Sequence, residues 1–291
     1  LQTGLPTQGH IMLEELNILA NADVAALGAE SADAIHLMAE TKKLAYADRL
    51  AYSGDPRYVS VPLDAILSAD FARERFETID MAHARDQVDA GLIPERAGDT
   101  TYLCAVDGDG NAVSFIHSLS AAFGSNVVAG NTGILLNNRA GRGFELVPGH
   151  PNVIAPGKRT MHTLNCYMVL EDGRPRWVGG TPGGDGQPQW NMQVLVNLID
   201  FGLNEQQAIE APRWTSFPGT DPAGRPNDFE LRLEERVPAS VIDELRARGH
   251  RVRVQGPWAG GGAAQVIGID QATGVLAGGS DPRTEGLALG Y

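Results

Sequence analysis

The feature that most constrains this chain is a pair of strand-like segments around a short polar turn. Residues 101–106 and 112–117 are rich in apolar and β-branched side chains, and the Asp-Gly-Asp-Gly-Asn between them consists of residues that tolerate positive φ. The pattern predicts a β-hairpin. It begins at the pair Thr100 and Thr101, after a loop-like stretch over residues 91–99.

Thr100 has two interpretations. Threonine is common at the head of a strand, and the local pattern by itself favours this reading. If the peptide bond between Asp99 and Thr100 were cut, however, Thr100 would carry both a hydroxyl and a free α-amine. Such an amine titrates at about pH 7.7–8.0 and can accept the hydroxyl proton. One residue would then supply both nucleophile and base.

Composition limits the partners and cofactors that we expect. The chain has 291 residues and a formal net charge of −13, which argues against nucleic-acid and anionic-membrane partners because both need clustered Lys and Arg. No apolar run approaches the roughly 18 residues of a membrane span. Cys104 and Cys166 fall in strand-like runs and no Cys/His spacing resembles a zinc motif, so we expect buried thiols, no metal and no other cofactor. The chain begins at Leu1 without a signal peptide, and its localisation is not readable.

The sequence pattern predicts a helical first third followed by strands and turns. Apolar spacing predicts one helix over residues 10–27, a second that begins after a cap at Ser31, and a third helical region over about 62–90. Further helices are expected over residues 189–201, 204–211 and 238–248. Strands are expected over residues 101–106, 112–117, 131–136, 164–170, 176–180, 228–233, 251–254, 264–269 and 275–278. Turns of hairpin length favour an α/β or α+β class with a largely antiparallel sheet.

Two more motifs can carry chemistry. Residues 179–186, Gly-Gly-Thr-Pro-Gly-Gly-Asp-Gly, follow a strand and precede a helix. Backbone N–H groups at such a junction could face a phosphate or the oxyanion of an acyl-transfer intermediate, although a structural glycine turn fits the same residues. In the loop of residues 137–144, Arg139 and Arg142 could bind a substrate carboxylate or remain solvated. His162 and Thr163 could add hydrogen bonds, although a lone histidine is more often structural.

Taken in order, these motifs resemble the γ-glutamyltranspeptidase family. The residues that carry the resemblance are Asp99-Thr100-Thr101, 107–113, 133–138, 156–159, 181–184, 211–213, 280–283 and the terminal Gly290-Tyr291. Residues 1–99 resemble the last part of the family's large subunit and are expected to be mostly helical. Residues 100–291 resemble its small subunit, which begins at the nucleophile.

The resemblance implies an α+β fold of the N-terminal-nucleophile type, a four-layer αββα sandwich. It implies that a precursor cuts itself between Asp99 and Thr100 into large and small subunits, and a dimer of these is one arrangement it allows. The new amine activates the Thr100 hydroxyl, which attacks a small-molecule acyl amide. Gly183 and Gly184 match the family's oxyanion donors. Ser118 matches a threonine that hydrogen-bonds the terminal threonine.

Several positions depart from the family's pattern. Arg142 stands where γ-glutamyl enzymes have the acidic residue that holds the substrate α-amine, and Arg139 replaces a neutral amide side chain. His162 and Thr163 replace a pair of serines, and Ser120 replaces an asparagine. Two like charges at 4 Å repel by ~4 kcal/mol at an effective dielectric constant of about 20. We therefore expect an acyl group with a carboxylate but no α-amine, oxamate-like or glutaryl-like, as in the acylase and amidohydrolase branches.

Two alternatives stay open at this stage. One is authentic γ-glutamyl hydrolysis or transfer by the same nucleophile. The other is an unprocessed, non-catalytic homologue that serves as a binding or structural subunit, because without cleavage before Thr100 the amine base does not exist.

Overall fold

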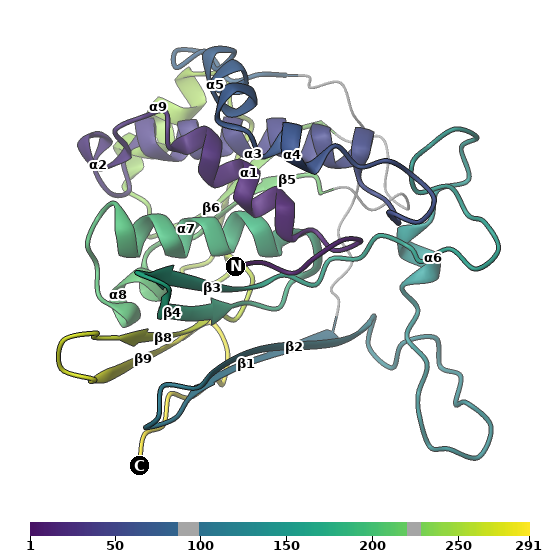
Figure 1. Cartoon of the computed structure of the whole chain (residues 1–291). Coiled ribbons are helices and arrows are strands. Elements are labelled where there is room, and N and C mark those ends of the chain that lie inside the picture. Colours follow the sequence, from purple (N-terminus) through teal and green to yellow (C-terminus); the bar gives the residue numbers. More distant parts are fainter. Residues whose placement is uncertain (87–98, 220–227) are drawn as a thin grey trace.

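The computed structural model describes residues 1–86, 99–219 and 228–291. These residues form a mixed α and β structure in layers, with helices above a four-stranded sheet and a two-stranded sheet below it (Figure 1). The fold class is therefore confirmed at the level of mixed helix and sheet. Among the described helices, none has both the length and the apolar character that crossing a membrane requires.

The helices come from both sides of Thr100. Those before it are α1 (Gly9–Leu19), α2 (Val24–Leu27), α3 (Ala32–Tyr52), α4 (Leu63–Ile66) and α5 (Ala69–Glu77). Those after it are α6 (Ala140–Gly143), α7 (Gln187–Ile199), α8 (Glu205–Glu210) and α9 (Ala239–Ala247), with a 3₁₀ turn over Gly184–Gly186.

The helix starts follow side-chain capping. Ser31 begins α3 as expected, since its hydroxyl accepts from the Ala34 N–H at 3.0 Å. The single helix expected over residues 10–27 is wrong, because α1 ends at Leu19 and the Asp23 carboxylate caps the separate α2. The region expected as one helix over 62–90 contains two short helices, and its residues 87–90 lie outside the described part of the chain.

The strands of the described residues form three sheets. The hairpin is β1 (Asp99–Val106) with β2 (Ala112–Ser120), antiparallel as predicted. The larger antiparallel sheet has the order β3-β4-β8-β9, and a third sheet has the order β5-β6-β7, of which only the β6–β7 pair is parallel. The bounds are β3 (Cys166–Glu171), β4 (Arg174–Gly180), β5 (Trp214–Phe217), β6 (Glu230–Glu234), β7 (Val252–Gln255), β8 (Gln265–Ile269) and β9 (Leu276–Ser280).

Two strand expectations differ from the structure. Residues 131–136 form no strand: Gly133 has φ of 72°, and Leu135 makes only an isolated bridge to Val128. Strand β5 was not predicted. Its four residues are all buried, so it lacks the alternation of apolar and polar residues by which a half-exposed strand is recognised.

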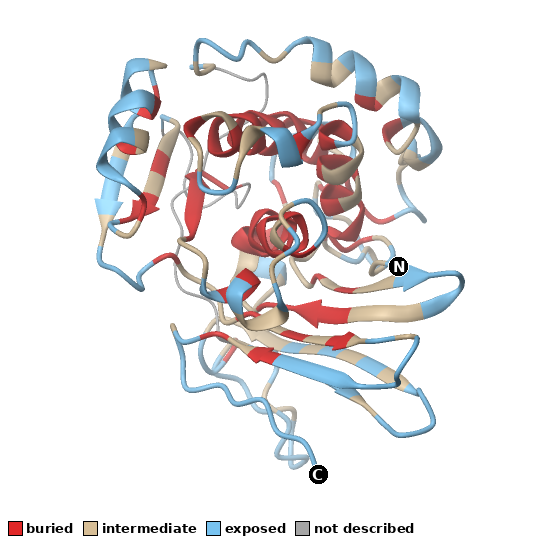
Figure 2. Ribbon diagram, turned by 90° about the vertical axis from the view of Figure 1, so that its left-hand side faces the viewer, coloured by how far each residue is buried: buried red, intermediate tan, exposed pale blue. Residues whose placement is uncertain are grey.

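Two apolar cores hold the helices on the sheets. One joins α3 to α7, α9 and the β5-β6-β7 sheet, and the other joins α1 and α7 to β3 and β8. Figure 2 shows the buried residues concentrated in these central helices and the strands that face them. Residues before and after Thr100 therefore share both cores.

The fourth layer of the expected sandwich is not seen among the described residues. The outer face of the hairpin presents Leu103, Val113 and Phe115, each about half exposed at 47%, 51% and 49%. In Figure 1 none of the drawn helices covers that face. The described residues thus supply helices above the four-stranded sheet and the hairpin below that sheet, and they supply no helical layer below the hairpin.

The motifs near the carboxyl end are structural. Arg213 Nη1 contacts Asp281 Oδ2 at 2.6 Å, and Arg283 Nη1 contacts Asp281 Oδ1 at 3.1 Å. Arg283 also donates through Nε and Nη2 to both oxygens of Glu234, at 2.6 and 2.7 Å. All four side chains are buried, so this network ties β5 and β6 to the end of β9.

The hairpin is seated on the larger sheet by a close approach of Tyr102 to Gly180. A Cβ added at Gly180 would lie 2.6 Å from Tyr102 Cε2. The Tyr102 hydroxyl and the Gly179 carbonyl both bond Ser114 Oγ, at 2.8 and 3.2 Å. Since Ser114 pairs with Cys104 in the hairpin, the Thr100 end of β1 runs toward the residues that follow Gly180.

This contact predicts the effect of a methyl group at Gly180. Gly180→Ala should destabilise the protein by about 1–3 kcal/mol, because the methyl group overlaps the Tyr102 ring. The measurement is the free energy of unfolding in urea. Gly108→Ala is the matched control, since a Cβ there meets nothing within 4 Å, and it should change that free energy by less than about 0.5 kcal/mol. Equal effects of the two substitutions would contradict the packing argument.

Candidate active site

The structure places Thr100 beside Ser118. The two residues are paired across the hairpin, and their hydroxyl oxygens lie 2.9 Å apart. The register shifts between Asp99, which pairs with Ser120, and Thr100, so the ladder is irregular at the peptide bond that joins Asp99 to Thr100. Ser118 Oγ also accepts from the Ser120 N–H at 2.9 Å.

The neighbours of Thr100 are poorer nucleophiles. Thr101 is exposed on the outer face of the hairpin, away from the larger sheet. Cys104 lies on the inner face, but burial raises the pKa of its thiol to about 11. Since the thiolate is the reactive form, Cys104 stays unreactive near neutral pH.

The loop that carries the two arginines contacts the end of β2. Arg142 Nη1 donates to the Ser120 carbonyl at 3.4 Å, and Asn138 Oδ1 accepts from the Ala121 N–H at 2.9 Å. Arg139 Nε donates to the Met161 carbonyl at 3.1 Å. Both arginines are half-buried, so neither extends freely into solvent.

Ser120 has a strained backbone in this corner. Its φ is 77°, in the left-handed region that asparagine tolerates better than serine, and its hydroxyl oxygen is buried without a hydrogen-bond partner in the described structure. Strain and an unsatisfied polar atom together are typical of a functional site.

His162 is neutral and surrounded by positive charge. Burial, followed by the charges of Arg139, Arg159 and Arg49, lowers its pKa to about 4. Three guanidinium groups therefore lie close enough to act on one half-buried imidazole.

Residues 181–186, the glycine segment, follow β4 and need glycine at position 183. Gly183 has φ of 135°, and a Cβ there would overlap the ring of Trp190. Gly184 has φ of 54°, and a Cβ there would meet nothing within 4 Å. The Gly183 carbonyl accepts from the Gly186 N–H at 2.9 Å, which closes the 3₁₀ turn. Since C=O and N–H point in opposite directions in a trans peptide, the Gly184 N–H points away from that turn.

Several residues that support the site were missed in the sequence. Asp55, which lies three residues after the end of α3, accepts from the Arg159 backbone N–H at 2.8 Å and from its side chain at 3.1 Å. It thereby anchors the segment that leads to His162 and Thr163. Arg49 in α3 pairs with Asp185 at 2.8 Å, next to Gly184. The sequence does not single out Arg49, because α3 carries five other charged residues: Asp33, Glu40, Lys42, Lys43 and Asp48.

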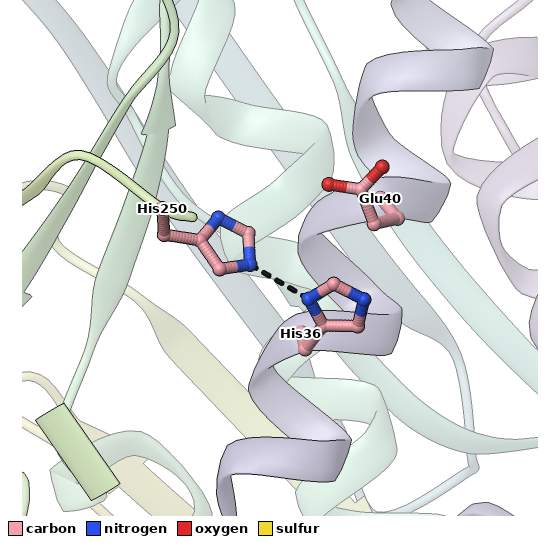
Figure 3. Close-up of side chains that lie close together, drawn as sticks. All are labelled: His36, Glu40 and His250. Carbon is pink, nitrogen blue, oxygen red and sulfur yellow. Dashed lines mark hydrogen bonds between the residues drawn. The ribbon is translucent and has the colours of Figure 1, made fainter. Parts of the chain in front are cut away.

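One group of side chains in the described part of the chain has the composition of a metal site: His36, Glu40 and His250 (Figure 3). Their contacts account for it without an ion. His36 Nδ1 lies 2.8 Å from His250 Nε2, and His36 Nε2 lies 2.9 Å from the Asp80 carbonyl, to which it must donate. The Glu40 carboxylate is already held by Lys43 at 2.6 Å and by Arg85 at 3.6 Å. We therefore interpret the group as a hydrogen-bonded histidine pair beside an ion pair.

A cavity of about 260 Å³ lies next to this pair, lined by residues of α3, β6 and their neighbours, including Lys43, Phe229 and His250. None of the candidate site residues is among the described residues that line it. The cavity is thus a separate feature from the arrangement around Thr100.

Comparison with known proteins gives a consistent result. The sequence profile described as Gamma-glutamyltranspeptidase matches residues 1–291. The chain is 39% identical over 289 residues to the glutathione hydrolase-like YwrD proenzyme of Bacillus subtilis, covering 98% of this chain and 52% of that protein. It is 38% identical over 288 residues to the oxamate amidohydrolase proenzyme of Klebsiella pneumoniae, with the same two coverages.

The fold comparison agrees. The crystal structure of cephalosporin acylase from Bacillus halodurans matches with a TM-score of 0.84 and 37% identity, over 100% of this chain and 51% of that one. The chain therefore spans about half the length of the relatives that it matches.

The histidine pair predicts how stability depends on pH. Burial, with Lys43, His36 and Arg248 as further causes, lowers the pKa of His250 to about 3, and burial also lowers that of His36. The unfolded chain then takes up protons below about pH 6.5 while the folded chain does not, so stability falls as the pH falls. From pH 6.5 to 5, His250 alone should account for about 2 kcal/mol of this loss.

Urea unfolding of the wild type and His250→Gln at both pH values measures this contribution. Gln keeps an N–H donor for His36 but does not titrate, so the loss should be smaller in the variant. His117→Gln, at an exposed histidine, controls for removing any imidazole. Identical losses in the wild type and His250→Gln would contradict the prediction.

Proposed function

The chain belongs to the γ-glutamyltranspeptidase family, and on this basis we propose that it carries the catalytic centre of a self-processing amidohydrolase with Thr100 as nucleophile. The observation that carries the proposal is the contact of the Thr100 and Ser118 hydroxyls at 2.9 Å, beside an irregular Asp99–Thr100 junction. The proenzyme names of its relatives support processing of a precursor into large and small subunits.

Processing begins with Thr100 in a peptide bond, as it is in β1. Its hydroxyl oxygen attacks the carbonyl carbon of Asp99, and the bond from that carbon to the Thr100 nitrogen breaks. The ester that results is hydrolysed by water. The products are a carboxylate at Asp99 and a free α-amine at Thr100, so the reaction creates its own general base.

Turnover then uses Thr100 alone for two tasks. The α-amine takes the hydroxyl proton while the oxygen attacks the acyl carbon of the substrate, and the departing amine receives that proton. Water hydrolyses the acyl-enzyme by the same route in reverse. Because Ser118 Oγ accepts from the Ser120 amide, its own O–H can donate to Thr100 Oγ and orient it.

The Gly183 and Gly184 N–H groups are proposed to bind the oxyanion of the tetrahedral intermediate. Two observations support them. The hairpin packing directs the Thr100 end of β1 toward the residues after Gly180, and the Gly184 N–H points away from the 3₁₀ turn. Backbone donors of this kind need no reorganisation when charge develops, and the loss of one costs about 2.7–4 kcal/mol.

The substrate is proposed to be an amide of a small acyl group that has a carboxylate and no α-amine. Arg139 and Arg142 both contact the site segments, through the Met161 and Ser120 carbonyls. These charges attract a carboxylate and repel an ammonium group. Ser120, His162 and Thr163 would complete the acyl pocket.

A second candidate is hydrolysis or transfer of γ-glutamyl groups. The name of the Bacillus subtilis relative, glutathione hydrolase-like, favours it. The nucleophile and the processing step would be the same, so the two candidates differ only in how the acyl group is held.

Removing the Thr100 hydroxyl tests the nucleophile. Thr100→Ala should abolish turnover of acyl amides, because a methyl group cannot attack a carbonyl carbon, whereas Thr100→Ser should retain part of it. The measurement is amine release per mole of protein. Thr101→Ala is the matched control, one residue away on the exposed face, and should keep kcat within about twofold. Turnover by Thr100→Ala would refute the assignment.

The substrate preference is tested with a glutaryl anilide and its γ-glutamyl counterpart. The two differ only in the α-amine, so the ratio of their kcat/KM values at fixed pH and salt isolates that contact. We expect at least a tenfold preference for the glutaryl compound, since the arginines repel the ammonium group that only the γ-glutamyl compound carries; a tenfold ratio corresponds to about 1.4 kcal/mol.

Substitution of the arginines links this ratio to the loop. Arg142→Asp should move it toward the γ-glutamyl compound, and Arg139→Gln should do so more weakly. A wild-type preference for the γ-glutamyl compound would favour the second candidate. An unchanged ratio of the two kcat/KM values in both variants would show that residues other than Arg139 and Arg142 discriminate against the α-amine.

A further inference from the structure

Gln8 connects two segments of the candidate site from a part of the chain that carries none of its proposed chemistry. It is the residue before α1, and its side chain is completely buried. Its Nε2 donates to the Thr163 carbonyl at 2.5 Å and to the Gly184 carbonyl at 3.0 Å. One amide group thus bridges the acyl-pocket segment and the oxyanion segment.

The orientation of this amide follows from its partners. Arg49 Nη1 donates to Gln8 Oε1 at 2.7 Å, and a guanidinium group can only donate. The two carbonyl oxygens can only accept. All three bonds therefore require the nitrogen to face Thr163 and Gly184 and the oxygen to face Arg49. Both N–H groups and the oxygen are used.

Arg49 extends the connection to the next residue of the glycine segment. Its Nη2 contacts Asp185 Oδ1 at 2.8 Å, and both side chains are buried. The Tyr46 hydroxyl donates to the Asp185 carbonyl. Gly184 and Asp185 are consequently held by side chains from the start of α1 and from α3.

The segment around Thr163 is tied to the same stretch of chain. The His162 N–H donates to the Pro6 carbonyl at 3.0 Å, and Thr3 Oγ1 donates to the Leu164 carbonyl at 3.3 Å. Residues 3–8 therefore run along residues 162–164. Gln8 is the point at which this contact reaches the glycine segment.

We propose that Gln8 is a positioning residue that sets the distance between the acyl pocket and the oxyanion site. The proposal rests on the function proposed above for Gly184 and Thr163. Gln8 touches neither substrate nor nucleophile. It acts by fixing the carbonyl of Gly184, and with it the plane of the peptide that follows the proposed oxyanion donor. Because Gln8 precedes Thr100, the upstream fragment would position the site of the downstream fragment after cleavage.

The chain offers a matched control in Gln193 of α7. That glutamine is also buried, and its Nε2 also donates to two carbonyls, those of Gln189 and Trp214, at 2.9 and 3.0 Å. Its Oε1 accepts from the Trp214 N–H at 3.2 Å. It has the same bonding pattern as Gln8 but joins α7 to β5, and its side-chain hydrogen bonds within the described residues reach only Gln189 and Trp214.

The test compares Gln8→Glu with Gln193→Glu in the complete protein. Each change replaces two donors with an oxygen that faces two carbonyl oxygens, so each should lower the thermal stability. Kinetics are normalised to the number of active sites, counted with a covalent acylating reagent. Gln8→Glu should lower kcat for the glutaryl anilide at least tenfold, and this factor should exceed the factor by which KM rises. Gln193→Glu should keep both kcat and KM within twofold of the wild type. Equal kinetic effects in the two variants would overturn the proposal.

Hydrogen–deuterium exchange provides a readout that does not need activity. Gln8→Glu should raise exchange in peptides that cover residues 160–165 and 181–187, and Gln193→Glu should leave both unchanged. Unchanged exchange in Gln8→Glu would overturn the proposal whatever the kinetics. If the wild type hydrolyses no acyl amide but Gln8→Glu still raises exchange in these two regions, the proposed function is refuted. The positioning role of Gln8 then stands.

Gln8→Met serves if Gln8→Glu fails to fold. Methionine has nearly the same length and introduces no buried charge, but it donates to neither carbonyl. It should give the same loss of kcat and the same two regions of raised exchange. A Met variant with wild-type kcat and exchange would overturn the proposal.

Discussion

The close approach of Tyr102 to Gly180 is the contact on which the arrangement of the site depends. Only a glycine leaves room for the aromatic ring between the two sheets, and the ring fixes where the hairpin lies along β4. From there the geometry of the strands determines the rest. Thr100 is two residues before Tyr102 on the same face of β1, and the glycine segment starts immediately after Gly180. Residues about 80 positions apart in the sequence (Thr100 and Gly180) are thereby brought to one corner of the molecule.

Buried charges hold that corner in place. Arg49 pairs with Asp185 and both side chains are buried, while the buried Asp55 pairs with Arg159, whose side chain is about half exposed. Each pair joins a residue before Thr100 to a segment after it, and only the first pair is buried on both sides. A buried ion pair adds little net stability because desolvation offsets the attraction, but breaking it costs several kcal/mol, commonly about 3–5 kcal/mol. Such pairs therefore specify one arrangement of the loops. This is what a site assembled from two fragments of a cleaved chain would need.

Much of this could be predicted from the sequence, wherever local chemistry decides the structure. The hairpin of residues 101–117 and the Ser31 cap follow from turn and capping residues. The strand expected over 131–136 does not exist, because the segment turns back on residues 127–129 with only a single bridge, and Gly130 and Gly133 both have positive φ. Strand β5 and the role of Gln8 depend on partners distant in sequence, so no local sequence pattern predicts them. The pairing of Thr100 with Ser118 was expected from family resemblance, and the hairpin register supplies the physical reason for it.

The central claim is that Thr100 becomes a chain terminus, and the mass of the purified protein tests it most directly. The purified wild type is incubated at neutral pH and then denatured. Its mass is measured by mass spectrometry, and the fragments are sequenced by Edman degradation. The account predicts two fragments in equal amounts, one of which begins Thr-Thr-Tyr-Leu-Cys at Thr100. A single unbroken chain, or cleavage at any peptide bond other than the one between Asp99 and Thr100, would contradict it.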